Sequence, residues 1–511
     1  MTTITWRRTG PRRVSGLLAF AALGVTAVGA GGAPAASASP AVASARLLAG
    51  AGSAGSLLGD GWGGKAADAA GLAGDAVNHP QADPGSLFTV TRAVGARRLW
   101  QQTDPSGSPV TGAGVTVALL DSGVSPVQGL SAPGKITYGP DFTDGAAASG
   151  GQDDFGHGTF MAGLIAAADV PVNKDGTAVP VNSAEPAAQE GLAPGAGLLS
   201  VKLAGADGST SVDSVIAGLS WVAAHRHDNG MNVRVVNLSF GATALQPYQV
   251  DPLAAAAEAA WRAGIVVVVS VGNSGPSAGG VDDPALDPFV LAVGASDPQA
   301  KADGWNKPAV ADFSSRGSTV RHADLLAPGQ SLVSLRDPGS TIDVANPQGP
   351  VAGDSSGRLF RGSGTSQAAA VTSGAVALLL QAHPELTPDQ VKADLTATAV
   401  PVKDASVLDA GAGQIDLPAA LSAADGMAGK DKLDLSGAVQ SYPASTGLDG
   451  VDPGDLAGSW DGARWNGARW NGARWNGARW NGARWNGARW NGARWNGARW
   501  NGARWNAADW S

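Results

Sequence analysis

Short apolar segments alternate with helix-like segments from about residue 88 to residue 424. The strand-like segments are almost continuously apolar and cover residues 115–120, 198–203, 233–238 and 265–271. The helix-like segments between them cover residues 159–168, 211–225, 252–263 and 366–381. Strands that are apolar along their whole length are typical of a parallel sheet covered on both faces. The sequence therefore predicts an α/β fold, a mostly parallel sheet with helices on both faces in three layers.

Length and composition exclude several classes of protein. The 511 residues exceed one ordinary domain, and 44% of them are hydrophobic, which suits a large globular core. A net charge of −8 argues against nucleic acid as a partner. The absence of cysteine excludes disulfides, thiol catalysis and cysteine-ligated zinc. We expect a monomer that does not bind nucleic acid.

The N-terminus has the pattern of an export signal. Four arginines between residues 7 and 13 precede a small-residue apolar stretch that runs from Leu17 to about Ala30. Ala36-Ser37-Ala38 then fits the small-x-small cleavage rule, so residues 1–38 are predicted to be a signal peptide. An uncleaved anchor is less favoured, because the stretch is rich in glycine and only marginally long enough to span a membrane. The prediction is a secreted protein, with Sec and twin-arginine export both left open.

Composition also divides the rest of the chain. Residues 39–84 are rich in Ala, Gly and Ser and are predicted to be a poorly ordered leader or short pro-segment. The catalytic domain is predicted over residues 85–424, and residues 425–459 are a Gly-, Asp-, Ser- and Pro-containing linker. Residues 460–511 form a repeat tail. The folded domain is thus predicted to lie between low-complexity N- and C-terminal extensions.

Three glycine-flanked segments place an aspartate, a histidine and a serine in that order. Asp121 lies at the end of a predicted strand, His157 lies in Gly156-His157-Gly158-Thr159, and Ser366 lies in Gly364-Thr365-Ser366. Each segment alone is common in loops. The order Asp, His, Ser is that of the subtilisin triad and differs from the chymotrypsin and α/β-hydrolase orders. On these segments the chain resembles the subtilisin-like serine proteases, the subtilase family (peptidase family S8).

The resemblance implies a subtilisin-like three-layer fold and a secreted serine endopeptidase that works through an acyl-enzyme. Ser366 would be the nucleophile, and His157 would act first as general base and then as general acid. Asp121 would hold the correct tautomer of His157 and stabilise its imidazolium form. A peptide carbonyl also needs donors for its oxyanion, and Asn273, which follows a predicted strand, resembles the family's donor. Polypeptides are the implied substrates.

A further segment resembles the strand against which a subtilase binds its peptide. Ser239, Phe240 and Gly241 follow the predicted strand 233–238. Exposed backbone there would pair with an extended substrate by β-augmentation. These three residues are therefore predicted to bind substrate.

No cofactor is required for this chemistry, and no metal ligand is predicted. Asp141, Asp144, Asp153 and Asp154 suggest calcium, which many subtilases bind. A solvated acidic loop is favoured instead, because the chain has no Asp-x-Asp-x-Asp-Gly loop. A structural calcium ion is left open, without assignable ligands. The other histidines are predicted to be surface or structural residues: His79, His225, His227, His322 and His383.

The tail repeats Asn-Gly-Ala-Arg-Trp every five residues, a period that matches neither a helix nor a strand. Two alternatives remain open: a compact run of turns with stacked Trp and Arg, or a flexible low-complexity tail. The tail has nine arginines and only two aspartates. We hypothesise that it binds cell wall, glycan or another anionic surface. An alternative function follows, in which the protein is a surface-binding or processing protein and the tail is its main functional element.

Overall fold

The structure is a computed structural model. It describes residues 76–77, 79–143, 150–169, 189–242, 247–277, 279–298 and 308–427, and the backbone of two short tail segments. The predicted signal peptide, the predicted linker from residue 428 onward, and most of the predicted leader and tail lie outside the described residues. None of the helices in the described part combines the length and apolar character that a membrane span requires.

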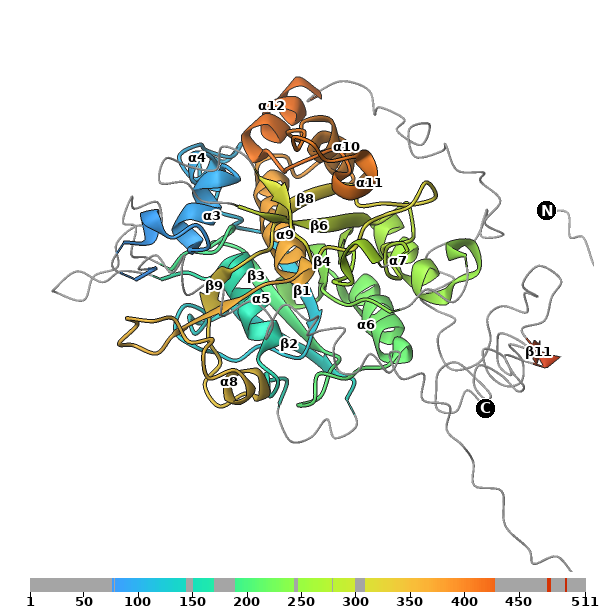
Figure 1. Cartoon of the computed structure of the whole chain (residues 1–511), viewed down its shortest axis with the longest axis horizontal. Coiled ribbons are helices and arrows are strands. Elements are labelled where there is room, and N and C mark those ends of the chain that lie inside the picture. Colours follow the sequence, from blue (N-terminus) through green and yellow to red (C-terminus); the bar gives the residue numbers. More distant parts are fainter. Residues whose placement is uncertain are drawn as a thin grey trace, which may run out of the picture. The chain divides into compact units, whose positions relative to one another are not determined.

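An eight-stranded sheet forms the centre of the domain (Figure 1). Its order is β2–β3–β1–β4–β5–β6–β7, with β8 also paired to β6. All of its pairs are parallel except β6 with β7. The strands are β1 (Thr116–Asp121), β2 (Ile136–Asp141), β3 (Gly197–Lys202), β4 (Val233–Leu238), β5 (Val266–Ser270), β6 (Leu291–Asp297), β7 (Ala309–Val310) and β8 (Leu325–Pro328). The predicted mostly parallel sheet is confirmed.

The helices in the described residues include four that correspond to predicted helices. They are α5 (His157–Ala166), α6 (Val212–His225), α7 (Pro252–Arg262) and α9 (Thr365–Ala382). The others are α3 (Leu87–Ala93), α4 (Ala96–Leu99), α8 (Thr341–Ala345), α10 (Pro388–Ala397), α11 (Val407–Ala410) and α12 (Leu417–Met427). Short 3-10 helices cover Pro80–Ala82, Asp228–Gly230, Tyr248–Val250 and Gly275–Ser277.

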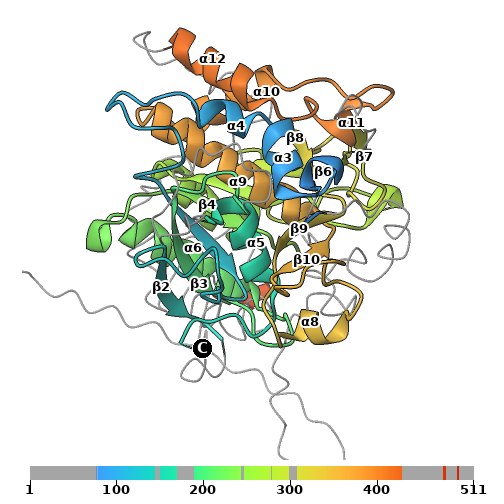
Figure 2. The ribbon, with the colours of Figure 1, turned by 90° about the vertical axis from the view of Figure 1, so that its left-hand side faces the viewer.

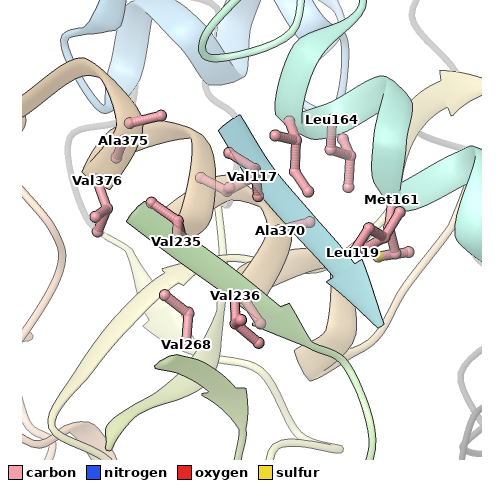
Figure 3. Close-up of a cluster of buried hydrophobic side chains, with 14 of the residues drawn as sticks. Val117, Leu119, Met161, Leu164, Val235, Val236, Val268, Ala370, Ala375 and Val376 are labelled. Carbon is pink, nitrogen blue, oxygen red and sulfur yellow. The ribbon is translucent and has the colours of Figure 1, made fainter. Parts of the chain in front are cut away.

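Successive residues of β1 face opposite helical layers, as the period of a strand requires. Figure 3 shows Leu119 beside Met161 of α5, in a cluster that also contains side chains of α9. The next residue, Leu120, lies against α6, where a Cβ at Gly218 would be 3.4 Å from its side chain. Both leucines are completely buried. This alternation places α5 and α9 on one face of the sheet and α6 on the other, so the predicted three layers are confirmed.

Two smaller pairs of strands lie outside the main sheet. The antiparallel pair β9 (Leu332–Leu335) and β10 (Leu359–Gly362) packs against α5. In the tail, β11 (Asn476–Ala478) and β12 (Gly492–Ala493) pair with each other in parallel. The remainder of the repeat lies outside the described residues, so the two alternatives for the tail stay predictions.

The N-terminal part of the domain packs beside its C-terminal helix. The backbone N–H of Leu417 in α12 donates to the carbonyl of Val94 at 3.1 Å, and Figure 2 shows α4 near α12. Further upstream, Asp83 is completely buried and forms an ion pair with Arg361 of β10. Residues 79–84 were predicted to belong to the leader. The folded region therefore begins earlier than the predicted boundary at residue 85, because a long-range ion pair holds this segment.

Candidate active site

Asp121 is the last residue of β1, at the carboxyl edge of the sheet where open α/β sheets place their ligands. Its side chain is completely buried. The backbone N–H of Ser122 donates to Asp121 Oδ1 at 2.8 Å. The same oxygen lies 2.7 Å from Nδ1 of His157. The end of β1 therefore places the carboxylate of Asp121 against the imidazole of His157.

His157 begins helix α5, and its side chain is also completely buried. Because a carboxylate oxygen accepts at Nδ1, the proton of the neutral ring is on Nδ1 and Nε2 carries the free electron pair. Nε2 has no hydrogen-bond partner among the described residues. The imidazole is thus oriented and able to accept a proton at Nε2.

Gly156 explains why α5 begins at His157. Gly156 has φ 100°, a left-handed conformation that favours glycine and interrupts the helix immediately before His157. A Cβ at Gly158 would lie 2.0 Å from the carbonyl oxygen of Gly123. The flanking glycines therefore allow the start of α5 to approach the end of β1 closely.

Asp153 and Ser122 hold this arrangement, and sequence reasoning missed both roles. Asp153 accepts hydrogen bonds from the backbone N–H groups of Gly156 and Thr159, both at 2.7 Å. Ser122 Oγ donates to Asp153 at 2.8 Å and accepts from the N–H of Gly158 at 3.0 Å. Burial raises the pKa of Asp153, while these donors oppose that shift. An aspartate shortly before a Gly-His pair was the available signal.

The prediction of a solvated acidic loop is therefore wrong for Asp153, which is buried and bonded to the backbone. Asp154 is half-exposed and pairs with Lys202 at 2.6 Å. Both carboxylates therefore have partners within the protein, and a structural calcium ion, left open by the sequence without assignable ligands, stays a prediction. Asp144 lies outside the described residues. In the described part of the chain, no group of three His, Cys, Asp or Glu side chains could hold a metal ion.

Three of the other predicted histidines make contacts away from Asp121 and His157. His225 stacks on Trp221 in α6, with ring centroids 4.4 Å apart. His383 follows α9 and contacts Asp425 at 3.1 Å. His322 contacts the carbonyl of Ala323 at 2.7 Å through Nδ1. None of these three contacts involves Asp121 or His157.

Ser366 is the second residue of helix α9 and is buried. Its Oγ donates to the carbonyl of Ser239 at 3.4 Å, and Ser239 Oγ donates to the carbonyl of Ser366 at 3.2 Å. The structure therefore brings Asp121 and His157 together directly and holds Ser366 against the end of β4. In this state the hydroxyl of Ser366 bonds to Ser239 and not to His157. Hydrogen bonds to a catalytic base are often made only when substrate is bound.

Asn273 lies just beyond the end of β5 and contacts the start of α9. Its Oδ1 accepts from the backbone N–H of Thr365 at 2.8 Å and from Thr365 Oγ1 at 3.0 Å. The amide nitrogen, Nδ2, is consequently the half that remains for a ligand. The N–H of Ser366 is a first-turn donor of α9, which has no intrahelical acceptor. Two donors thus belong to adjoining segments at this end of the sheet, as an oxyanion site requires.

The segment predicted to bind substrate is less exposed than expected. Ser239, Phe240 and Gly241 are all buried, and the Phe240 side chain belongs to the core. The next residue, Ala242, is partly exposed. Ala242 itself pairs with Asp283 through two backbone hydrogen bonds of 2.9 and 3.0 Å. Any substrate contact here must therefore come from the backbone, since the side chains point into the protein or to Ser366.

Comparison with known proteins assigns this arrangement to a family. The subtilase family model matches residues 112–426, more than half of the chain. The chain belongs to the subtilase family. The predicted resemblance and the predicted subtilisin-like α/β fold are thereby confirmed, and the predicted enzyme class, a serine-type endopeptidase, is supported.

Individual relatives of this subtilase are named as proteases. The chain is 36% identical over 312 residues to serine protease AprX of Bacillus subtilis (strain 168). The aligned region covers 60% of this chain and 65% of AprX. It is 34% identical over 302 residues to subtilisin Savinase of Lederbergia lenta, covering 59% of this chain and 89% of that protein. The chain thus spans slightly less than two thirds of the length of AprX.

A solved structure supports the fold of the subtilase. Fervidolysin from Fervidobacterium pennivorans, described as a keratinolytic enzyme related to subtilisin, aligns with a TM-score of 0.50 and 27% identity. The alignment covers 69% of this chain and 47% of fervidolysin.

Proposed function

We propose that this subtilase is a secreted endopeptidase in which Asp121, His157 and Ser366 form the catalytic triad. The observation that carries the proposal is the buried 2.7 Å contact between Asp121 Oδ1 and His157 Nδ1, which leaves Nε2 of His157 able to accept a proton. A buried carboxylate–imidazole pair of this kind supports a neighbouring nucleophile. The family of the chain supports the same class of reaction.

The first half of the reaction forms an acyl-enzyme. The hydroxyl of Ser366 turns from the carbonyl of Ser239 toward His157, and Nε2 takes its proton as Oγ attacks the peptide carbonyl carbon. The oxyanion that forms accepts hydrogen bonds from Asn273 Nδ2 and from the N–H of Ser366. His157 then gives the proton to the leaving amine, and the peptide C–N bond breaks.

The second half restores the enzyme. A water molecule gives a proton to Nε2 of His157 and attacks the ester carbonyl, again with Asn273 and the Ser366 N–H holding the oxyanion. The bond between Ser366 Oγ and the carbonyl carbon breaks, and His157 returns the proton to Oγ. Throughout, Asp121 keeps the proton on Nδ1 and stabilises the imidazolium. No step of this sequence uses a cofactor.

Labelling by a serine-directed fluorophosphonate tests the proposal. The wild-type protein should be labelled and should digest unfolded casein, whereas Ser366→Ala should do neither while keeping the circular dichroism spectrum of the folded protein. Ser356→Ala is a matched control, because Ser356 lies in an exposed loop and, among the described residues, its side chain bonds to Asp354 alone. It should be labelled normally. Unchanged labelling of Ser366→Ala would exclude Ser366 as the nucleophile.

The proposed location is outside the cell, which the arginine-led apolar N-terminus and the small-x-small site at residues 36–38 support. Mass spectrometry of the protein recovered from culture medium would give both mature ends. Recovery only from the cell interior, with residues 1–38 retained, would contradict secretion. We expect the folded protein to be a monomer, which light scattering after gel filtration can test.

The tail is proposed to hold the protease at a cell wall, glycan or other anionic surface. Its nine arginines and eleven tryptophans between residues 460 and 511 combine positive charge with aromatic rings, on a chain whose net charge is −8. Binding to purified cell wall should fall when residues 460–511 are removed, while casein hydrolysis is retained. Equal retention of both forms would contradict the proposal. Wall binding without any casein hydrolysis would favour the alternative in which the tail is the main functional element.

A further inference from the structure

An unpaired carboxylate lies between the two segments that adjoin the proposed nucleophile and oxyanion donor. A Cβ at Gly272 would be 2.2 Å from Asp282 Oδ2, and a Cβ at Gly241 would be 2.8 Å from the same oxygen. Gly272 directly precedes Asn273, and Gly241 is two residues beyond Ser239. Because glycine stands at both positions, the space between the segments holds the Asp282 carboxylate.

Backbone hydrogen bonds fix Asp282 in this place. Its N–H donates to the carbonyl of Val271 at 3.1 Å, one residue before Gly272. The next residue, Asp283, exchanges two backbone hydrogen bonds with Ala242, one residue after Gly241. The Asp282 backbone is thus tied to both segments, and its carboxylate points between them.

The carboxylate has no partner in the described structure. Asp282 is partly exposed, and within the described ranges no hydrogen-bond donor and no cation lies within bonding distance of its side-chain oxygens. Burial raises its pKa to about 6, with no neighbouring cation to oppose the shift. A side chain that covered this carboxylate without pairing with it would leave it desolvated, which is energetically costly, whereas a bound cation would offset that cost.

The catalytic geometry determines which part of a substrate meets this carboxylate. The carbonyl that Ser366 attacks must lie between Asn273 Nδ2 and the Ser366 N–H, and it belongs to the residue just before the cleaved bond, P1. Ser239, whose carbonyl is 3.4 Å from Ser366 Oγ, lines the same place. A P1 side chain that enters between the segments of Ser239–Gly241 and Gly272–Asn273 is therefore directed to Asp282.

We propose that Asp282 selects substrates with lysine or arginine at P1, by pairing its carboxylate with the cation of that side chain. This inference rests on the proposed function, because it takes Ser366 and Asn273 as the groups that position the cleaved bond. A long side chain can place its apolar stem beside the two glycines and its charged end at the carboxylate. An apolar P1 side chain would instead leave Asp282 desolvated and unpaired.

A series of tetrapeptide p-nitroanilides that differ only at P1 tests the inference on the full-length protein. We expect kcat/KM for P1 Lys and Arg to exceed that for P1 Leu and Phe by at least about tenfold. Asp282→Asn, which keeps the shape and removes the charge, should lower the Lys and Arg values by at least about tenfold. Its values for Leu and Phe should stay near those of the wild type, which also shows that the variant is folded.

Asp228→Asn is the matched control. It removes the same charge from an exposed position before β4, at the opposite end of the strand from Gly241. Its P1 preference should be that of the wild type. Benzamidine, a cation without a cleavable bond, gives a second measurement that needs no variant: it should inhibit the wild-type protein competitively.

The outcomes separate this inference from the proposed function. A wild-type protein that cleaves Leu and Phe substrates best, with a ratio that Asp282→Asn does not change, would overturn the role of Asp282 and leave the protease intact. Absence of competitive inhibition by benzamidine would count against it in the same way. Failure of the proposed function would look different, since neither the peptides nor a fluorophosphonate would react, and the inference would then fall with it.

Discussion

The backbone N–H of Thr365 donates a 2.8 Å hydrogen bond to Oδ1 of Asn273. Because a backbone N–H can only donate, the atom of the amide that faces it must be the oxygen, and Nδ2 must lie on the other side. The residue before the proposed nucleophile thus sets the direction of the proposed oxyanion donor. The contact joins segments 92 positions apart in the chain.

Asn273→Asp should lower kcat by about 10²–10³, with little change in KM. Aspartate has the same shape and still accepts from Thr365, but it offers no N–H and adds a negative charge next to the oxyanion. Steady-state kinetics on a peptide p-nitroanilide measure the effect, and the melting temperature reports folding. A fall in kcat of less than tenfold in a folded variant would remove Asn273 from the oxyanion site.

Asp121→Asn should lower kcat by about 10⁴ near neutral pH. The asparagine amide can donate to Nδ1 of His157, which moves the ring proton to Nε2 and removes the acceptor that Ser366 needs. Fluorophosphonate labelling should slow in parallel. Asp228→Asn, an exposed substitution of the same kind, should keep normal activity. Labelling of Asp121→Asn at the wild-type rate would show that Asp121 does not set the tautomer.

Asp83→Ala should lower the free energy of unfolding by about 3 kcal/mol, the low end of the range for a buried ion pair. The substitution leaves the Arg361 guanidinium, which is 16% exposed, without its carboxylate, and it also removes the acceptor of the Gly85 N–H. Denaturant unfolding measures the change. Lys403→Ala is the control, because the Lys403–Asp404 pair is exposed and should contribute nothing measurable. Equal stability of the two variants would contradict a structural role for residues 79–84.

The ratio of kcat/KM for P1 Lys to that for P1 Leu should rise as pH increases through about 6. Burial raises the pKa of Asp282 to about 6, so its carboxylate is neutral below this pH and can pair with a cation above it. A ratio of two substrates cancels any pH effect on the catalytic steps that both substrates share.

Three other carboxylates lie near Asp282 and can contribute to the pH profile. Asp283 adjoins Asp282, and Asp251 and Asp287 act on Asp283. Burial, followed by these neighbours, raises the pKa of Asp283 well above its ordinary value. A variant without the Asp282 carboxylate separates the titration of Asp282 from that of Asp283. The same ratio measured on Asp282→Asn should be flat with pH, and a slope retained in that variant would assign the titration to another group.

Local sequence patterns predicted the elements that carry the candidate site. The apolar run before Asp121 is β1, the helix after Gly156 is α5, and the alanine-rich helix after Gly364 is α9. Such patterns work because strand and helix periods are local properties of the chain. Strands β2 and β6 were not predicted, since their glycines and small polar residues weaken the apolar signal.

The sequence by itself determined the family of this protein, the order of its candidate catalytic residues and the layered α/β architecture. Tertiary structure alone decided that Asp153 is a buried support for His157, that Ser366 rests against Ser239, and that Asp282 lies between two glycines. The physical reason is that hydrogen bonds and close approaches between distant segments depend on how the sheet and helices pack. The sequence does not distinguish an aspartate that is solvated from one that is bonded to the backbone or one that is placed to bind a cation.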